Sequence, residues 1–176
     1  MDGLLEYFIL EPEREFHIRE LAKKAGRSPT TIAKHLDGYK KKGVLAGRRK
    51  LNHLLYKANT ENRQFKDLKL AYNIQRLRET GLIDFLNDTF NQPEALILFG
   101  SFSKAEDTAR SDIDLLVITP LKKRPDLSVY ERALHRKIQL FLHSKAEIEE
   151  MKTKNKELLN GLVNGVLMNG YWELFT

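Results

Sequence analysis

The chain of 176 residues contains no cysteine. This absence excludes disulfide bonds, thiolate metal sites and a cysteine nucleophile. No apolar run approaches the roughly 18 residues that are typical of a membrane span. The first residues combine an acidic side chain with a short apolar run and do not resemble a signal peptide. We therefore expect a cytoplasmic protein with no membrane partner.

Positive charge is concentrated in the first third of the chain. Residues 1–60 hold 13 Lys and Arg against 7 Asp and Glu, whereas residues 61–176 hold 17 of each. Ten basic residues and one acidic residue, Asp37, lie between Lys23 and Lys50. A compact basic patch on an otherwise neutral chain is typical of a protein that binds a polyanion. The alternative is a solvated, lysine-rich helix face.

The pattern within this basic third favours a nucleic-acid binder. After a first short helix, "FHIRELAKKAG" predicts an extended piece and a helix that ends at Gly26. "SPTTIAKHLDGYKKKG" predicts a second helix, with Ser28 as N-cap, Pro29 at the first helical position and Gly43 at the end. Two helices joined by about three residues form a helix-turn-helix unit. "VLAGRRK" and "LNHLLYKAN" then predict two strands around a basic turn at residues 49–52.

Residues 1–59 resemble the winged helix-turn-helix domains of archaeal and bacterial transcription regulators. The resemblance implies that the second helix lies in the major groove of double-stranded DNA and that the wing touches the backbone or the minor groove. Regulators of this kind usually read two half-sites, so we also expect a possible homodimer. The alternatives are a protein-contact role or a vestigial domain. The matching positions are Arg27, Ser28, Thr30, Thr31, Lys34 and His35 on the helix, and Arg48, Arg49 and Lys50 on the wing.

The middle of the chain, residues 60–90, reads as a helical linker that Gly81 interrupts. Its apolar stripe either packs on a second domain or pairs with its copy in a dimer, and core packing is the preferred interpretation.

Two aspartates stand at the start of a predicted buried strand in "GSFSKAEDTARSDIDLLV", residues 100–117. Side chains alternate along a strand, so Asp112 and Asp114 point the same way, with Cα atoms about 6.6 Å apart. Two such carboxylates repel each other unless a cation lies between them. Mg²⁺ suits this arrangement, because it takes a few carboxylates together with phosphate oxygens. The alternative is that Ser111 and Asp112 cap the strand while Asp114 makes a surface ion pair.

The preceding strand, "EALILFG", ends at a Gly-Ser pair. Gly100 allows the backbone to approach a ligand closely, and a helix that starts just after Ser101 offers N–H groups to a phosphate. Gly-Ser ten residues before Ser-Asp-x-Asp, between two apolar strands, is more specific than the aspartates alone.

This motif resembles the Gly-Ser…Ser-Asp-x-Asp motif of minimal nucleotidyltransferases in the DNA polymerase-beta superfamily. The resemblance implies that Gly100, Ser101, Lys104 and Ser111 bind a nucleoside triphosphate. It also implies that Asp112 and Asp114 are catalytic and hold Mg²⁺ during attack on the α-phosphate. Ala105 is a departure, because the family usually has glycine there.

A second departure lies on the predicted strand "KIQLFLHS". The family normally supplies a third carboxylate from a later strand, and Gln139 stands in that place. Glutamine can neither accept a proton nor neutralise a metal, so catalysis is left open. His143 lies on the same predicted face, as a substitute base or, preferably, as a surface or satisfied histidine. The remaining histidines show no metal-ligand spacing.

These patterns together predict an α+β protein. We expect a winged helix-turn-helix in residues 1–59, a helical linker in 60–90, and a nucleotidyltransferase fold in 91–176 with a small mixed sheet flanked by helices. In the last segment, Ser144 and Glu147 predict a capping box, and apolar periodicity extends the helix to Gly170. Gly161 and Gly165 are expected to pack closely on the sheet, and residues 171–175 to add an edge strand.

Three functions are consistent with this organisation. The first is a DNA-binding regulator whose second domain binds Mg-nucleotide as a signal. The second is an active nucleotidyltransferase that moves a nucleoside monophosphate to a protein or RNA acceptor. The third is an antitoxin-like partner protein that keeps the fold without its chemistry.

Overall fold

The computed structural model describes residues 3–51 and 53–173 of the chain. The chain folds as two compact units, Met1–Lys69 and Leu70–Thr176, and the division between them falls within helix α4 (Arg63–Glu79). The three-part division at residues 59 and 90 remains a prediction.

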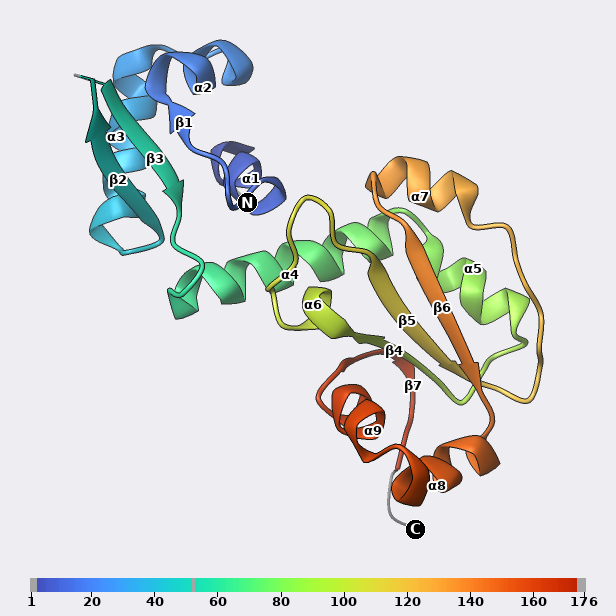
Figure 1. The fold of residues 1–176 in the computed structure, drawn as a ribbon. Helices are drawn as coiled ribbons and strands as arrows, with labels where there is room; N and C mark the ends of the chain where they lie inside the picture. The colour runs from blue at the N-terminus through green and yellow to red at the C-terminus, as the bar shows by residue number, and fades with distance from the viewer. Residues whose placement is uncertain (1–2, 52, 174–176) are drawn as a thin grey trace. The chain divides into compact units, whose positions relative to one another are not determined.

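The first unit combines three helices with a small antiparallel sheet of order β1-β3-β2 (Figure 1). Its buried core is built from apolar residues of every element, including Phe8, Phe16 and Leu36. Local sequence sets the helix ends: Ser28 Oγ accepts a hydrogen bond from the Thr31 N–H at 3.1 Å, and Gly26 takes the left-handed conformation. The elements are α1 (Gly3–Leu10), β1 (Phe16–His17), α2 (Ile18–Ala25), α3 (Pro29–Lys41), β2 (Leu45–Lys50) and β3 (His53–Ala58).

The second unit contains a mixed sheet of order β6-β5-β4-β7. Strands β5 and β6 are parallel and are connected through α7, whereas the other two pairings are antiparallel. The predicted linker is helical, with α4 and α5 separated by Gly81 in the left-handed conformation. The elements after α4 are α5 (Leu82–Thr89), β4 (Ala95–Phe99), α6 (Gly100–Ser103), β5 (Ile113–Ile118), α7 (Ser128–Leu134), β6 (Ile138–His143), α8 (Lys145–Lys154), α9 (Lys156–Val163) and β7 (Val166–Gly170).

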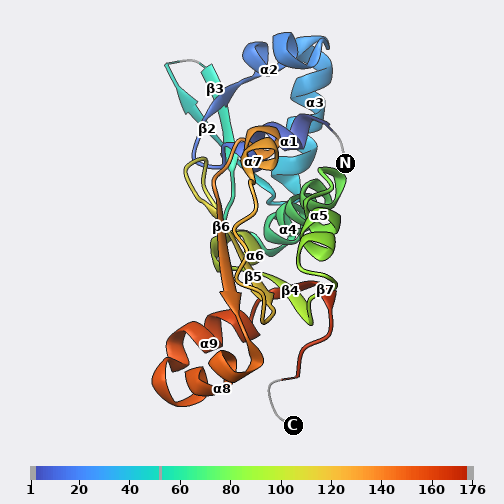
Figure 2. The ribbon, with the colours of Figure 1, turned by 90° about the vertical axis from the view of Figure 1, so that its right-hand side faces the viewer.

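Helices cover both faces of this sheet, α5 and α7 on one side and α8 and α9 on the other (Figures 1 and 2). Alternate residues of β5 enter the two cores: Leu115 packs with α5 and α7, and Leu116 packs with α8 and α9. The apolar stripe of α4 and α5 also packs in the first of these cores, through Leu77 and Leu86. The preferred interpretation of the stripe as core packing is thereby supported.

The C-terminal helix differs from its prediction. The capping box of Ser144 and Glu147 is present, but the helix is broken at Asn155, and the chain turns at residues 164–165 into strand β7. A side chain at Gly165 would lie 2.7 Å from the Leu98 carbonyl oxygen, so this glycine does pack against the sheet, whereas Gly161 has no atom within 4 Å of its missing Cβ.

The helix prediction for residues 164–170 was wrong, because a short apolar run such as "VLM" fits a helix and a strand equally well. Residues 171–173 form no strand, and residues 174 and 175 of the proposed edge strand lie outside the described residues.

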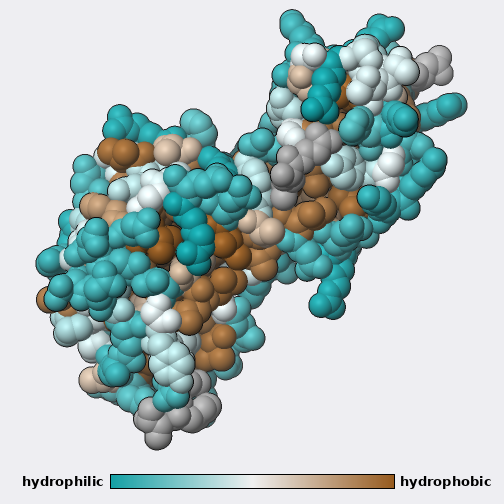
Figure 3. All heavy atoms as spheres, turned by 180° about the vertical axis from the view of Figure 1, so that it is seen from behind, coloured by the Kyte–Doolittle hydropathy of each residue, from teal (hydrophilic) through white to brown (hydrophobic). Residues whose placement is uncertain are grey.

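In the described part of the chain, no helix has both the length and the apolar character needed to cross a bilayer. On the face seen in Figure 3, hydrophobic residues gather in patches on a mostly hydrophilic surface.

Candidate functional site

Gly100 brings the end of β4 against the carboxylate of Asp114. Its φ is +70°, which favours glycine over any residue with a Cβ. A Cβ at this position would collide with Asp114 Oδ2 and would lie 3.2 Å from Asp114 Cγ. The helix expected after Ser101 is the single turn α6, in which Ser103 Oγ donates to the Gly100 carbonyl at 2.9 Å. Glycine is therefore required here by both backbone conformation and space.

The two aspartates lie side by side at the start of β5. Asp112 directly precedes the strand, Asp114 is its second residue, and both are half-buried. Burial, and secondly the charge of Asp112, raise the pKa of Asp114. No cation of the described residues pairs with Asp114, so the predicted alternative of a surface ion pair is wrong. The two carboxylates therefore repel each other, and no cationic side chain of the described residues offsets the charge of Asp114.

Gln139 is brought to this acid pair by the register of β6. It stands opposite Asp114 in the parallel ladder, and its Nε2 donates a hydrogen bond to Asp112 Oδ2 at 2.7 Å. The position of the expected third carboxylate therefore holds a neutral amide in contact with Asp112. Within the described residues, no three Asp, Glu, His or Cys side chains come together in a metal-binding group.

The loop between α6 and β5 is fastened from α4. Asn73 Nδ2 donates to Asp107 Oδ1 at 2.9 Å and to the Phe102 carbonyl at 3.4 Å, and both Asn73 and Asp107 are buried. Within the loop, Ser111 Oγ accepts a hydrogen bond from the Thr108 N–H at 2.9 Å. Ser111 therefore shapes the loop that leads into the acid pair, and Asn73 and Asp107 are residues that sequence reasoning missed.

Two other residues of this loop carried predictions. Lys104 is exposed at the end of α6. Ala105 is buried and has a φ of +56°. This left-handed conformation gives a physical reason for glycine at the corresponding position of the resembling family.

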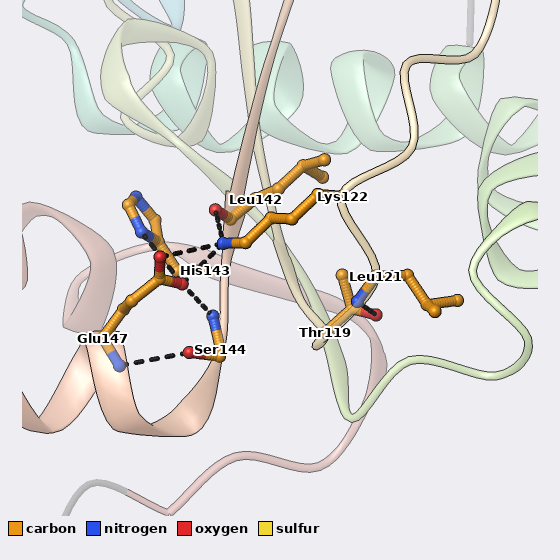
Figure 4. A network of polar contacts seen from close by, with 7 residues as sticks. All are labelled: Thr119, Leu121, Lys122, Leu142, His143, Ser144 and Glu147. Carbon is orange, nitrogen blue, oxygen red and sulfur yellow. Dashed lines mark hydrogen bonds and ion pairs between the residues drawn. The ribbon is translucent and has the colours of Figure 1, made fainter.

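His143 belongs to a different cluster, shown in Figure 4. It pairs in register with Ile118, four positions along β6 from Gln139, and so lies away from the acid pair. Lys122 Nζ donates to both carboxylate oxygens of Glu147, at 2.9 and 2.6 Å, and the Ser144 N–H donates to the same carboxylate at 2.6 Å. These hydrogen bonds, that of Lys122 foremost, lower the pKa of Glu147 to about 2.

Burial lowers the pKa of His143, and its Nδ1 is 4.0 Å from Glu147 Oε2. The cluster fastens β6 to α8, and it does not bring His143 into position as a substitute base.

In the first unit, four of the predicted DNA-contacting residues line one open hollow on α3. The hollow has a volume of about 700 Å³ and consists of Thr30, Thr31, Lys34, His35, Gly38, Tyr39 and Lys42. The DNA-contact prediction did not include Gly38, Tyr39 and Lys42. Gly38 lies one helical turn beyond Lys34, and Lys42 lies one turn beyond Gly38, so helical spacing could have indicated both. The result is a surface that carries both positive charge and hydrogen-bonding groups.

The remaining predicted DNA-contacting residues differ in their availability. Ser28 caps α3 and shares a hydrogen bond with Thr31 Oγ1 at 2.8 Å, while Arg27 is exposed just before it. Arg48 forms a bidentate salt bridge with Glu15, in which the hydrogen bond from Nη2 to Oε2 is 2.6 Å long.

Of the residues predicted to form a wing, Arg49 and Lys50 are exposed on β2, and Asn52 of the predicted turn lies outside the described residues. Strand β2 therefore carries two exposed basic side chains and one that is paired with Glu15.

The family described as polymerase beta nucleotidyltransferase matches residues 80–168. The chain belongs to this family. The match covers about half of the chain and includes the Gly-Ser pair, both aspartates and Gln139, whereas the whole first unit lies outside it. A search of curated proteins finds no match to the chain.

Proposed function

We propose that this nucleotidyltransferase domain binds a nucleoside triphosphate with Mg²⁺ and that the first unit binds double-stranded DNA, so that the protein acts as a nucleotide-responsive transcriptional regulator. The observation that carries the nucleotide site is the half-buried Asp114 carboxylate, which lies against Gly100 and beside Asp112 without a cationic partner among the described residues. Two adjacent carboxylates that repel each other provide a strong driving force for binding a divalent cation.

The side chains present fit Mg²⁺. This ion is usually held by one or two carboxylates, with waters and substrate phosphates completing its shell. Asp112 and Asp114 would hold it, and it would supply positive charge to the phosphates. Gly100 and Ser101 would face the phosphates with backbone N–H and hydroxyl groups, and the exposed Lys104 would add charge.

Transfer of a nucleoside monophosphate is the second candidate. In that reaction the acceptor hydroxyl attacks the α-phosphorus, pyrophosphate leaves, and the hydroxyl proton goes to a base. Family membership and the two retained aspartates favour it. The amide of Gln139 cannot accept that proton, so we place binding before transfer. A partner protein without ligand chemistry is the remaining alternative, and it predicts that neither cation nor nucleotide binds.

DNA binding by the first unit is supported by charge and shape. The hollow on α3 is lined by Lys34, Lys42 and hydroxyl groups, and the exposed Arg49 and Lys50 lie on β2 of the same unit. A helix that presents such side chains is suited to the major groove, and lysine and arginine on a wing are suited to phosphates. A homodimer that reads two half-sites belongs to the same proposal.

The nucleotide site is tested with Mg²⁺ and each α-labelled nucleoside triphosphate, with and without cellular RNA and protein. The control is the Asp112→Asn, Asp114→Asn double variant. Binding by the wild type and not by the variant supports the regulator. Label transferred to an acceptor makes the protein an enzyme, whereas absence of both binding and transfer refutes the nucleotide site.

The DNA proposal is tested by titrating labelled genomic fragments at several salt concentrations. Lys34→Ala and Arg49→Ala should each weaken binding and lower the salt slope by about 1 if they contact phosphates. The charge-matched control is Lys156→Ala, an exposed lysine at the start of α9 in the other unit. Equal effects of all three substitutions would contradict a specific surface, and light scattering that finds only monomer on and off DNA would remove the dimer.

A further inference from the structure

We propose that Gln139 takes the place of a second cation at the acid pair, so that the site binds a single divalent cation with its nucleotide. The inference rests on the proposed function, because it concerns the same site. The feature that carries it is the hydrogen bond from Gln139 Nε2 to Asp112 Oδ2, at 2.7 Å.

The orientation of the amide follows from its partner. An ionised carboxylate only accepts hydrogen bonds, so the NH₂ group of Gln139, and not its carbonyl oxygen, must face Asp112. A hydrogen bond to an ionised group is shorter and about twice as strong as one between neutral groups. The parallel register of β5 and β6 holds the two side chains together, because it sets Gln139 opposite Asp114 on the same face of the sheet.

The amide has two consequences for cation binding. It places the positive end of a dipole against Asp112, which offsets part of the repulsion from Asp114 before any metal arrives. It also uses one acceptor site of Asp112 Oδ2 and adds neither an anionic ligand nor a negative charge. Two carboxylates without a third suit one Mg²⁺ completed by phosphates and water.

A carboxylate at position 139 would create the opposite situation. It would add two oxygens and a third negative charge at the same point, and three converging carboxylates attract more positive charge than one divalent ion carries. Since no third Asp, Glu, His or Cys joins the pair in the described part of the chain, residue 139 alone decides between these two states. We therefore regard Gln139 as the residue that sets the number of cations.

The experiment counts Mn²⁺ bound per full-length chain in the presence of a non-hydrolysable nucleoside triphosphate analogue, from the electron paramagnetic resonance of free Mn²⁺. The Asp112→Asn, Asp114→Asn double variant gives the background from other sites. We expect one Mn²⁺ for the wild type and two for Gln139→Glu. Gln139→Leu removes the donor without adding charge, and it should still bind one Mn²⁺.

A second readout uses unfolding without nucleotide. Because the amide partly offsets the repulsion, added Mg²⁺ should raise the unfolding temperature more in Gln139→Leu than in the wild type. If Gln139 had a role in packing alone, Gln139→Leu would unfold at a lower temperature by the same amount with and without Mg²⁺. The rise caused by Mg²⁺ would then be equal in the variant and in the wild type.

The outcomes separate the inference from the proposed function. Two Mn²⁺ in the wild type, or an unchanged count in Gln139→Glu, would overturn the inference and leave nucleotide binding intact. No Mn²⁺ above the background in the wild type would overturn both. If Gln139→Glu does not fold, the wild-type count and the comparison with Gln139→Leu still decide the matter.

Discussion

Substitution of Gly100 by alanine should damage the second unit in a way that substitution of Gly161 does not. At Gly100, with its φ of +70°, a residue with a Cβ costs about 1–2 kcal/mol. At Gly161, inside α9, nothing lies within 4 Å of the missing Cβ, and alanine should stabilise the helix by up to about 1 kcal/mol. The two variants should therefore differ by roughly 1–3 kcal/mol in the free energy of unfolding.

The steric part of the damage has a separate signature. The new Cβ would collide with the Asp114 carboxylate, which can rotate away from the acid pair. Gly100→Ala should then also lose cation binding, and Asp114→Ala should restore part of the lost stability when the two substitutions are combined, as a double-mutant cycle measures.

The assay is urea unfolding without cation or nucleotide, followed by the fluorescence of Trp172. This residue is the only tryptophan of the chain and packs against the core beneath α8 and α9, so it reports on the second unit. With a urea slope of about 1–3 kcal/mol per molar, the midpoints should differ by roughly 0.3–3 M. Equal midpoints for Gly100→Ala and Gly161→Ala would refute the reasoning about the backbone at the site.

Three further predictions concern charge and hydrogen bonds. Asp114→Asn should stabilise the cation-free protein at neutral pH, because a carboxylate whose folded pKa is raised destabilises the fold when ionised. Mg²⁺ should no longer stabilise this variant. A variant less stable than the cation-free wild type would contradict the reasoning. Since the folded pKa of Glu147 is about 2, its contribution to stability is complete above the unfolded pKa of 4.5 and is lost as the pH falls from there towards 2. In Glu147→Gln, the free energy of unfolding should therefore fall less steeply with decreasing pH in this range. An unchanged pH dependence would refute the assignment. Asn73→Ala should cost about 1–3 kcal/mol, because the buried Asp107 carboxylate loses a donor, whereas Asn164→Ala, which removes an exposed hydrogen bond, should cost much less in the same urea assay.

Much of the fold could be predicted from local sequence. The ends of α2, α3 and α8 follow from Gly26, Ser28 and the capping box at Ser144, because these residues satisfy backbone groups within a few positions of themselves. Alternating apolar residues located β5 and β6 and placed Asp112 and Asp114 on one face.

The remainder depends on contacts between distant residues. The hydrogen bond of Gln139 to Asp112 requires the register of two strands that are joined by a long connection, which no local pattern specifies. Asn73 and Asp107 lie 34 positions apart, and the partner of Arg48, Glu15, lies 33 positions before it. Strand β7 was missed because only its pairing with β4 distinguishes it from a helix.

The place of β7 in the sheet has a consequence for synthesis of the protein. Among the described residues, β7 is the last strand in sequence, yet it pairs with the first strand of its unit, Ala95 opposite Gly170. Until residues 166–170 leave the ribosome, β4 exposes one row of unpaired backbone groups on the segment "ALILF", and such an edge is prone to aggregation. The nascent chain therefore carries the aspartate pair on an unprotected sheet until β7 emerges, and chains truncated before β7 should aggregate.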